Sequence, residues 1–279
     1  TIKNGKIFTL TKDKSGDGKI DVDDLEWSYL KGDGDFNSAE IKKLRDEADI
    51  IITNPPFSLF REFFLWIEEG RKQFLLIGNM NAITYKELFS HIKENRVWLG
   101  ATNFNKGMYF KVPADFVYAD TYKFEKEQNK EMVNRVPGVC WFTNIDHGKR
   151  HQPLSLMTME ENIKFNKKIK GQEYQRYDNY DAIEVSFTDA IPSDYEEAMG
   201  VPITFLDKYS PEQFEIVGMC ENIDLYNLKT KVYTSSECKQ AYLDKFGKPG
   251  TYDLNASGVI IKNGLLEKVY QRILIKHKK

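Results

Sequence analysis

The chain has 279 residues, of which 41% are hydrophobic, 29% are charged and 13% are aromatic, so it is long and apolar enough for a buried core and is not a disordered chain. Its net charge of −2 does not by itself indicate a nucleic-acid-binding protein, so any such surface would have to be local. No apolar run approaches the ~20 residues of a membrane span, no signal peptide is visible, and the cysteines Cys140, Cys220 and Cys238 fit no metal pattern. We therefore expect a cytoplasmic protein with reduced thiols, no metal and no membrane partner.

The first segment contains two predicted strands and an acidic loop. Residues 6–10 and 25–30 have the pattern of short strands. Between them, the stretch from Asp13 to Asp24 has the ligand spacing of a calcium-binding EF-hand loop, with glycine in sixth place and an acid in twelfth. The twelfth acid is the short Asp24, and the residues before Asp13 look extended rather than helical. Calcium binding and a plain acidic surface hairpin both remain open for this loop.

The second predicted strand leads into Gly34-Asp35-Phe36. Glycine lets the backbone approach a ligand closely, and an acid beside an aromatic ring can hold the amine and the face of an adenine. A glycine turn without a ligand is the alternative interpretation. Residues 38–47 then predict an amphipathic helix with Ile41 and Leu44 facing inward.

The most informative stretch is a strand that ends in Asn54-Pro55-Pro56-Phe57. Three consecutive isoleucines, residues 50–52, predict a buried parallel strand. After it, the Asn54 amide and the Pro55 carbonyl are hydrogen-bond acceptors, and the two prolines stiffen the backbone. These acceptors could take both hydrogens of an exocyclic amine while Phe57 stacks on its ring. An ordinary turn is the alternative, but the position at the carboxyl end of a strand is where open α/β sheets bind ligands.

The segments that follow alternate between helix and strand. Residues 59–67 predict a helix that stops at Gly70, and residues 74–77 predict a buried strand. Thr84 and Glu87 have the spacing of a capping box, which predicts the start of a second helix. Residues 97–99, 108–112 and 138–142 predict further strands. The alternation favours right-handed crossovers and a doubly wound sheet.

After residue 145 the composition changes, because cations become interleaved with Phe165, Tyr174, Tyr177 and Tyr180. Cations beside aromatic rings suit phosphate contacts and stacking on displaced bases, while a solvated charged face is the alternative. Later strands are predicted at residues 200–205, 214–218 and 269–275. The candidate DNA-binding side chains are Lys149, Arg150, Lys164, Lys167, Lys168 and Arg176.

The tetrapeptide from Asn54 to Phe57 resembles the catalytic Asn-Pro-Pro-Phe motif of S-adenosylmethionine-dependent adenine-N6 DNA methyltransferases. Its surroundings resemble the EcoRI-type family of these enzymes in several blocks that occur in the family's order. The resemblance covers roughly residues 28 to 279. The blocks are residues 30–36, 58–62, 77–79, 81–87, 139–144, 177–183 and 199–205.

This resemblance implies a partial Rossmann-like methyltransferase domain over residues 1–145, with parallel strands, crossover helices and antiparallel closing strands at 108–112 and 138–142. It implies an α+β target-recognition region over residues 146–279. S-adenosylmethionine would be the cofactor, with Gly34, Asp35 and Phe36 at its adenine. Double-stranded DNA would be the substrate and a cognate restriction endonuclease a partner. The catalytic residues would be Asn54, Pro55, Pro56 and Phe57, acting on an adenine flipped out of the duplex.

A methyltransferase also needs a glycine-rich first βα turn for the amino-acid end of its cofactor. No such turn stands before Lys31 or after Asn144. We therefore expect an N-terminally truncated domain that binds the cofactor poorly and is inactive alone. Other functions stay open: a catalytically incompetent DNA-binding remnant, a methyltransferase acting on RNA bases or protein glutamine, and a calcium-binding accessory protein.

Overall fold

The computed structural model describes residues 4–102, 104, 107–111, 125–126 and 132–279. The chain divides into two compact units, Thr1–Gly78 and Asn79–Lys279. This division rests on contacts within the chain and does not test the functional boundary predicted between residues 145 and 146, which stays a prediction. Within the described ranges, no helix is long and apolar enough to cross a membrane.

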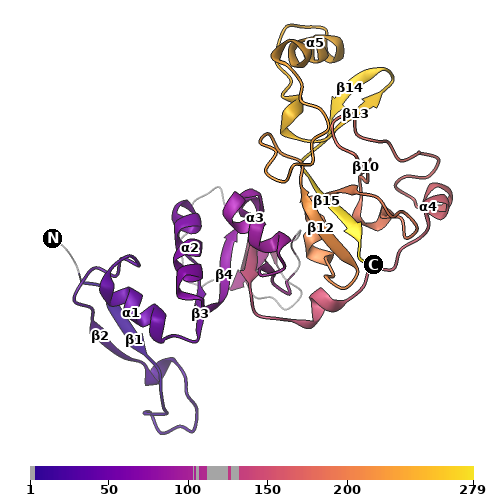
Figure 1. Cartoon of the computed structure of the whole chain (residues 1–279). Coiled ribbons are helices and arrows are strands. Elements are labelled where there is room, and N and C mark those ends of the chain that lie inside the picture. The colour runs from indigo at the N-terminus through magenta and orange to yellow at the C-terminus, as the bar shows by residue number, and fades with distance from the viewer. Residues whose placement is uncertain (1–3, 103, 105–106, 112–124, 127–131) are drawn as a thin grey trace. The chain divides into compact units, whose positions relative to one another are not determined.

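The first unit begins with a hairpin, as the sequence predicts. Strand β1 (Lys6–Thr9) pairs antiparallel with β2 (Glu26–Tyr29), and the acidic loop connects them (Figure 1). The Asp24 carboxylate accepts hydrogen bonds from the backbone N–H groups of Lys14 and Ser15 at 2.7 and 2.8 Å. The flanks are therefore strands rather than the helix pair of an EF-hand. Among the residues that the structure describes, no three His, Cys, Asp or Glu side chains are grouped to hold a metal.

The rest of the first unit is a parallel crossover. Helix α1 (Ala39–Glu47) begins at Ser38, whose hydroxyl accepts from the Ile41 N–H. Strand β3 (Ile50–Thr53) continues through helix α2 (Phe60–Gly70) to strand β4 (Gln73–Asn79), which pairs parallel with β3. The predicted strand–helix–strand unit is confirmed. Its core is formed by Phe60, Phe64, Ile67, Phe74 and Leu76.

Strand β3 is parallel but not buried, so that part of the prediction is wrong. The exposed fractions of Ile50 and Ile52 are 45% and 66%. These two side chains share one face because side chains alternate along a strand. In the described part of the chain, β3 is an edge strand with β4 as its neighbour, and the face that carries Ile50 and Ile52 is only partly covered.

The second unit begins with a short 3₁₀ segment (Met80–Thr84) and helix α3 (Lys86–Lys93). The predicted capping box at Thr84 is wrong, because the Thr84 hydroxyl donates to the Asn81 carbonyl at 2.8 Å and so completes the preceding turn. Strand β5 (Trp98–Leu99) pairs antiparallel with β9 (Val139–Thr143), as expected for a closing strand.

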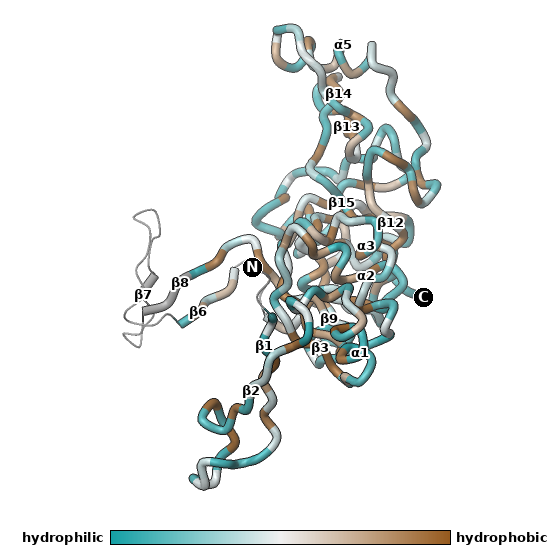
Figure 2. Tube along the Cα trace, turned by 90° about the vertical axis from the view of Figure 1, so that its left-hand side faces the viewer, coloured by the Kyte–Doolittle hydropathy of each residue, from teal (hydrophilic) through white to brown (hydrophobic). Residues whose placement is uncertain are grey.

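The prediction that residues 108–112 close the same sheet is wrong for the residues that are described. Strand β6 (Met108–Lys111) pairs antiparallel with β8 (Met132–Val136), which also pairs with β7 (Glu125–Lys126) (Figure 2). Val112 lies outside the described residues. Strands that are close in the chain usually pair with each other, and this local pairing uses the edge of β6 in a separate three-stranded sheet.

The remainder of the second unit mixes helices and strands. Helix α4 (Met159–Phe165) precedes a sheet of β10 (Ile183–Glu184), β11 (Met199–Pro202), β15 (Arg272–His277) and β12 (Phe214–Met219), in that spatial order. The strand predicted at 200–205 ends at Pro202, where a 3₁₀ segment takes over. Helix α5 (Ser235–Phe246) and the hairpin of β13 (Val259–Lys262) and β14 (Leu265–Lys268) lie between β12 and β15 in the chain (Figure 1).

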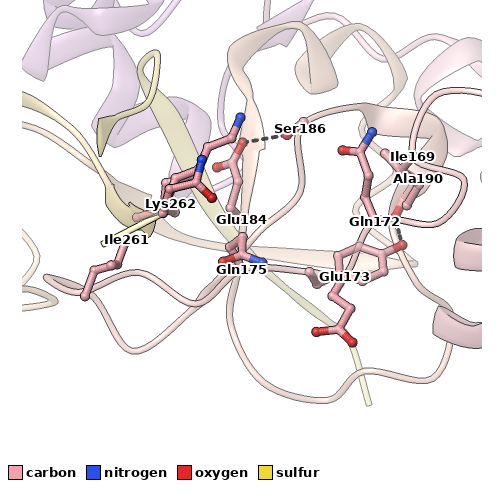
Figure 3. Close-up of a pocket in the computed structure, with 12 residues that line it drawn as sticks. Ile169, Gln172, Glu173, Gln175, Glu184, Ser186, Ala190, Ile261 and Lys262 are labelled. Carbon is pink, nitrogen blue, oxygen red and sulfur yellow. Dashed lines mark hydrogen bonds between the residues drawn. The ribbon is translucent and has the colours of Figure 1, made fainter. Parts of the chain in front are cut away.

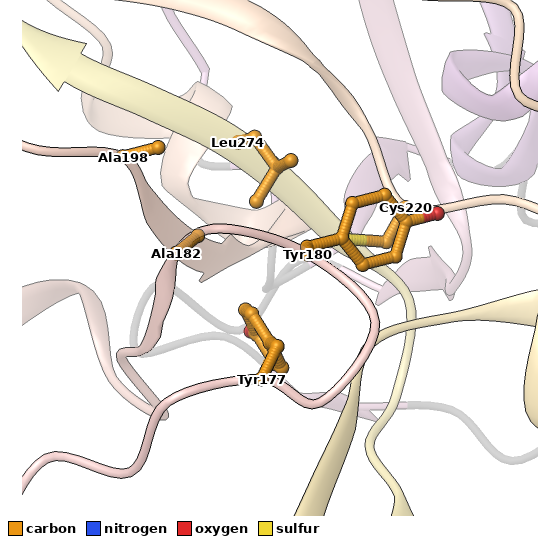
Figure 4. Packing of buried hydrophobic residues seen from close by; sticks show 6 residues of the cluster. All are labelled: Tyr177, Tyr180, Ala182, Ala198, Cys220 and Leu274. Atoms are coloured by element: carbon orange, nitrogen blue, oxygen red, sulfur yellow. The ribbon is translucent and has the colours of Figure 1, made fainter. Parts of the chain in front are cut away.

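Two tyrosines expected among DNA-facing aromatics are core residues instead. Tyr177 and Tyr180 are 6% and 2% exposed, and their rings meet edge to face at 6.3 Å (Figure 4). A side chain at Gly200 or Gly258 would collide with the Tyr177 ring, so the absence of a side chain at these two positions leaves room for the ring. Tyr177 also donates its hydroxyl to Glu184, which satisfies the polar end of a buried ring. The three cysteines are free thiols, as the sequence predicts, and all of them are buried.

Candidate active site

The tetrapeptide that ends β3 is anchored by its prolines. Pro55 is buried, whereas Asn54 and Pro56 are exposed and Phe57 is 41% exposed. The Pro56 carbonyl accepts from the Leu59 N–H at 2.9 Å and starts a 3₁₀ turn (Phe57–Leu59) that runs directly into α2. Neither proline has an N–H to leave unpaired, so the chain can turn here without losing a donor. The strand and the helix thus fix the backbone of the tetrapeptide from both sides.

The polar and aromatic groups of the tetrapeptide have no hydrogen-bond or aromatic partner in the described part of the chain. Within the described ranges, neither the Asn54 amide nor the Pro55 carbonyl makes a hydrogen bond, and the Phe57 ring has no aromatic partner. Phe60 and Phe64, only a few residues further on, are buried in the core. An exposed amide and a carbonyl without a hydrogen-bond partner, beside an exposed ring, are groups that suit an aromatic ligand with an exocyclic amine.

The Gly34-Asp35-Phe36 loop is attached to the same helix. The Phe36 ring meets Phe63 and Trp66 of α2 edge to face, at centroid distances of 5.2 and 5.8 Å. Gly34 has a φ of 91°, a conformation that favours glycine, and the nearest atom to an added Cβ would be 3.7 Å away. One Asp35 carboxylate oxygen accepts from the Asn37 N–H at 2.9 Å. The other carboxylate oxygen accepts no hydrogen bond from the described residues.

The loop therefore leaves an acceptor, a stretch of backbone and part of an aromatic ring available to a ligand. Asp35 is exposed and keeps an oxygen for an exocyclic amine, Gly34 leaves its backbone accessible, and Phe36 is half-buried with part of its ring uncovered. Helix α2 links this loop to the tetrapeptide, because it begins just after Phe57 and carries Phe63. Both candidate segments are thus tied to α2, the loop through the packing of Phe36 and the tetrapeptide through the chain itself.

A buried arginine, which the sequence pattern did not reveal, packs α1 on α2. Arg45 is 8% exposed, and its guanidinium lies 5.1 Å from the centre of the Trp66 ring. It donates to Asp46 and Glu69 at 2.8 Å each, and these bonds raise the pKa of Arg45. The amphipathic pattern instead indicated Ile41 and Leu44, which are only half-buried. An arginine at this spacing resembles a surface charge, so its burial is visible only in three dimensions.

The first two predicted DNA-binding cations are held by acids of the protein itself. The Lys149 ammonium lies 2.7 Å from Asp207, and its side chain is 28% exposed. The Arg150 guanidinium lies 3.6 Å from the centre of the Trp98 ring and 3.0 Å from Asp146, and its side chain is 9% exposed. These two side chains are part of the local packing after β9.

The other predicted cations are more accessible. Lys164, Lys167 and Lys168 are exposed within one turn of the end of α4. Phe165 is 61% exposed, and the Lys164 ammonium lies 5.1 Å from the centre of its ring. Lys168 is half-exposed and pairs with an acid at 2.9 Å. Arg176 is 58% exposed and also has an acidic partner.

Comparisons with known proteins point in the same direction as the motif. A family described as "Adenine-specific methyltransferase EcoRI" matches residues 3–278. The type II methyltransferase M.EcoRI of Escherichia coli is 42% identical over 227 residues, which cover 80% of this chain and 65% of that protein. M.MpnI of Mycoplasma pneumoniae is 39% identical over 74% of this chain and 63% of its own length.

M.MgeORF184P of Mycoplasma genitalium, also a type II methyltransferase, is 39% identical over 73% of this chain and 63% of its own length. The chain therefore spans less than two thirds of each of these relatives. No solved structure matches it at a significant level.

Proposed function

This chain belongs to the EcoRI adenine-specific methyltransferase family, and from that premise we propose that the protein transfers a methyl group from S-adenosylmethionine to N6 of an adenine in double-stranded DNA. The observation that carries the proposal is the tetrapeptide after β3, whose Asn54 amide, Pro55 carbonyl and exposed Phe57 ring have no hydrogen-bond or aromatic partner among the described residues. The relatives' names as type II methyltransferases support a role in restriction–modification, with a cognate endonuclease as partner.

The tetrapeptide would bind a target adenine that has left the DNA stack. Unstacking costs a few kcal/mol, and stacking on Phe57 together with backbone contacts returns part of it. The Asn54 side-chain oxygen and the Pro55 carbonyl would each accept one N6 hydrogen, which aims the nitrogen lone pair away from the ring plane. S-adenosylmethionine, when bound, supplies the electrophilic methyl group. Because the prolines restrict the backbone of the tetrapeptide, the Pro55 carbonyl and the base of the Asn54 side chain would need little rearrangement when the adenine arrives.

We propose that Gly34, Asp35 and Phe36 hold the adenine of the cofactor. The unused Asp35 oxygen would accept its exocyclic amine, and the uncovered part of Phe36 would contact its ring. The attachment of Phe36 to α2 supports this assignment, since α2 also positions the tetrapeptide. The two adenines, of cofactor and substrate, would then be held by segments of one unit.

Contacts to the DNA backbone are proposed for Lys164, Lys167, Lys168 and Arg176, which are the accessible cations of the predicted set. Phe165 offers an exposed ring among them. Lys149 and Arg150 are paired with acids and are also less exposed than Lys168 and Arg176, so we expect them to contribute less. Removing one phosphate contact should reduce the salt dependence of DNA binding by about one unit of slope.

The decisive experiment replaces Asn54 with Ala in the full gene product and measures methyl transfer to DNA, with the product nucleoside identified by mass spectrometry. We expect the rate of transfer to fall by roughly 10²-fold or more, by analogy with loss of one oriented polar group from an active site. The melting temperature should hardly change, because the Asn54 side chain is exposed and makes no bond within the described residues. The matched control is Asn4→Ala, which removes another exposed amide from the same unit.

A rate close to wild type in the Asn54→Ala variant would refute the role of the tetrapeptide. Transfer by the wild-type protein to RNA or to protein glutamine, but not to DNA, would replace the proposed substrate. Binding of DNA without any transfer would instead support a catalytically incompetent remnant.

A further inference from the structure

A groove runs beside the β13–β14 hairpin in the second unit. One part is a cavity of about 530 Å³ between residues 169–175 and β13 (Figure 3). A second cavity of about 470 Å³ continues along β14. Both are lined by Glu184, Ser186, Ile260 and Lys262, so they form one continuous depression, which we call the β13 groove.

The floor of the β13 groove is a buried ion pair whose hydrogen bonds are complete. Arg272 donates to Glu184 through Nη2 at 2.6 Å and through Nε at 3.1 Å. Ser186 and Tyr177 also donate to this carboxylate (Figure 3 shows the Ser186 bond). The charge of Glu184 is therefore paired and its carboxylate is fully hydrogen-bonded, which makes the floor a rigid base.

The rim of the groove carries polar groups that the fold does not use. Gln172, Gln175 and Asn263 are exposed, and their side-chain amides make no hydrogen bond with the part of the chain that the structure describes. Lys262 is exposed and forms no ion pair within the same ranges. A side-chain amide offers a donor and an acceptor together, which is the combination that matches the edge of an adenine, and lysine matches guanine.

The hairpin holds its part of the rim in a fixed position. Asn263 and Gly264 have φ values of 53° and 78°, and Lys262 pairs with Leu265 across them, which makes a two-residue turn that suits the twist of a hairpin. Ile261 and Leu265 beside the turn are 52% and 40% exposed. Apolar side chains of this kind can contact the methyl group of thymine. A two-stranded ribbon also has the width that the major groove of DNA admits.

We propose that the rim of the β13 groove reads the target sequence, with Gln172, Gln175, Lys262 and Asn263 contacting base edges in the major groove. This inference rests on the proposed function, since it assigns the sequence specificity of a DNA methyltransferase. The rim side chains are exposed rather than enclosed, so they suit a partner larger than the cavity. They are distinct from the cations of α4, which would contact phosphates and carry no sequence information.

The test determines the recognition motif of the full gene product by sequencing the methylated sites in DNA from a host without other adenine methylation. Three variants are compared with wild type: Gln172→Met, Gln175→Met and Asn263→Gly. Methionine keeps the size of glutamine without its hydrogen bonds, and glycine tolerates the positive φ at residue 263. Gln240→Met on α5 is the control with the same substitution, because this exposed amide, which donates to Asp244 at 2.7 Å, lies outside the groove.

We expect at least one groove variant to lose discrimination at one or two base positions by roughly 5- to 150-fold, the range for loss of one bidentate base contact. The control variant should keep the wild-type motif. An unchanged motif in all three groove variants, with methylation retained, would overturn the inference while leaving the proposed function intact.

If the wild-type protein methylates no DNA, the proposed function fails, and selection of binding sites from a randomised duplex library decides the inference separately. A motif enriched by wild type and relaxed in the groove variants would support sequence reading by the β13 groove. Enrichment of no motif, or of the same motif by every variant, would overturn it.

Discussion

Replacing Arg272 with Met should destabilise the second unit strongly. The arginine and Glu184 side chains are 8% and 6% exposed, so neither charge is stabilised by water. Methionine preserves most of the stem but removes every bond from the guanidinium to the carboxylate. Breaking a buried pair from one side leaves an uncompensated charge and costs about 3–5 kcal/mol. In a unit of this size that corresponds to a fall in melting temperature of roughly 6–20 °C.

Denaturant melts of single and double variants test this reasoning. Glu184→Gln combined with Arg272→Met should recover much of the loss, because the double variant no longer buries a lone charge. Lys43→Met is the control, since it breaks a pair at 3.7 Å whose side chains are 79% and 61% exposed and should cost under about 0.5 kcal/mol. A cost below about 1 kcal/mol for Arg272→Met, or a double variant no more stable than the single one, would refute the argument.

Three further predictions concern titratable groups. The His151 imidazolium donates hydrogen bonds to the carboxylates of Asp146 and Glu212, which raise the pKa of His151, so its stabilising contribution is complete below its unfolded pKa of ~6.5 and is lost as pH rises through the folded pKa. The difference in melting temperature between wild type and His151→Gln should therefore become smaller from pH 6 to pH 9. Melting temperatures of the two proteins that change with pH in parallel would contradict this. Backbone N–H bonds, first that of Ser15, lower the pKa of Asp24 to about 2, so its contribution is present above an unfolded pKa of ~3.9 and is lost as pH falls towards 2. Hydrogen exchange of the Lys14 and Ser15 backbone amides should be faster in Asp24→Asn than in wild type. Equal protection of these amides in the two proteins would count against the prediction. Burial raises the pKa of Cys140 to about 12, so a thiol reagent should modify it only as fast as the protein opens, and rapid labelling of the native protein would show otherwise.

The sequence predicts local elements well where a signal lies within a few residues. Ser38 marks the start of α1, and the polar-proline turn marks the end of β3, because both depend on the backbone bonds of their neighbours. Thr234 and Glu237 form a capping box for α5 that the same principle could have identified. Thr84 has the same spacing to Glu87, yet its hydroxyl bonds backwards to complete a turn.

What the sequence could not predict depends on partners that are distant in the chain. The pattern of Ile50 and Ile52 is that of a buried strand, but the burial of a strand depends on what covers its face. The position of Tyr177 among cations resembles a surface aromatic, whereas two glycines far along the chain open a core site for its ring. Arg45 is similar, because its burial requires the face of Trp66.

The same contrast separates structural from functional residues within the candidate site. Full burial of a phenylalanine side chain stabilises a fold by about 1.5–3 kcal/mol, and Phe60 and Phe64 contribute in this way. Phe57 stays 41% exposed, and the neighbouring Asn54 amide makes no bond within the described ranges, so the fold gains little from either. Pro55 is buried and belongs to the scaffold. Substitution of Pro55 should thus reduce stability, while the proposed chemistry would rest on the Asn54 and Phe57 side chains together with the Pro55 backbone carbonyl.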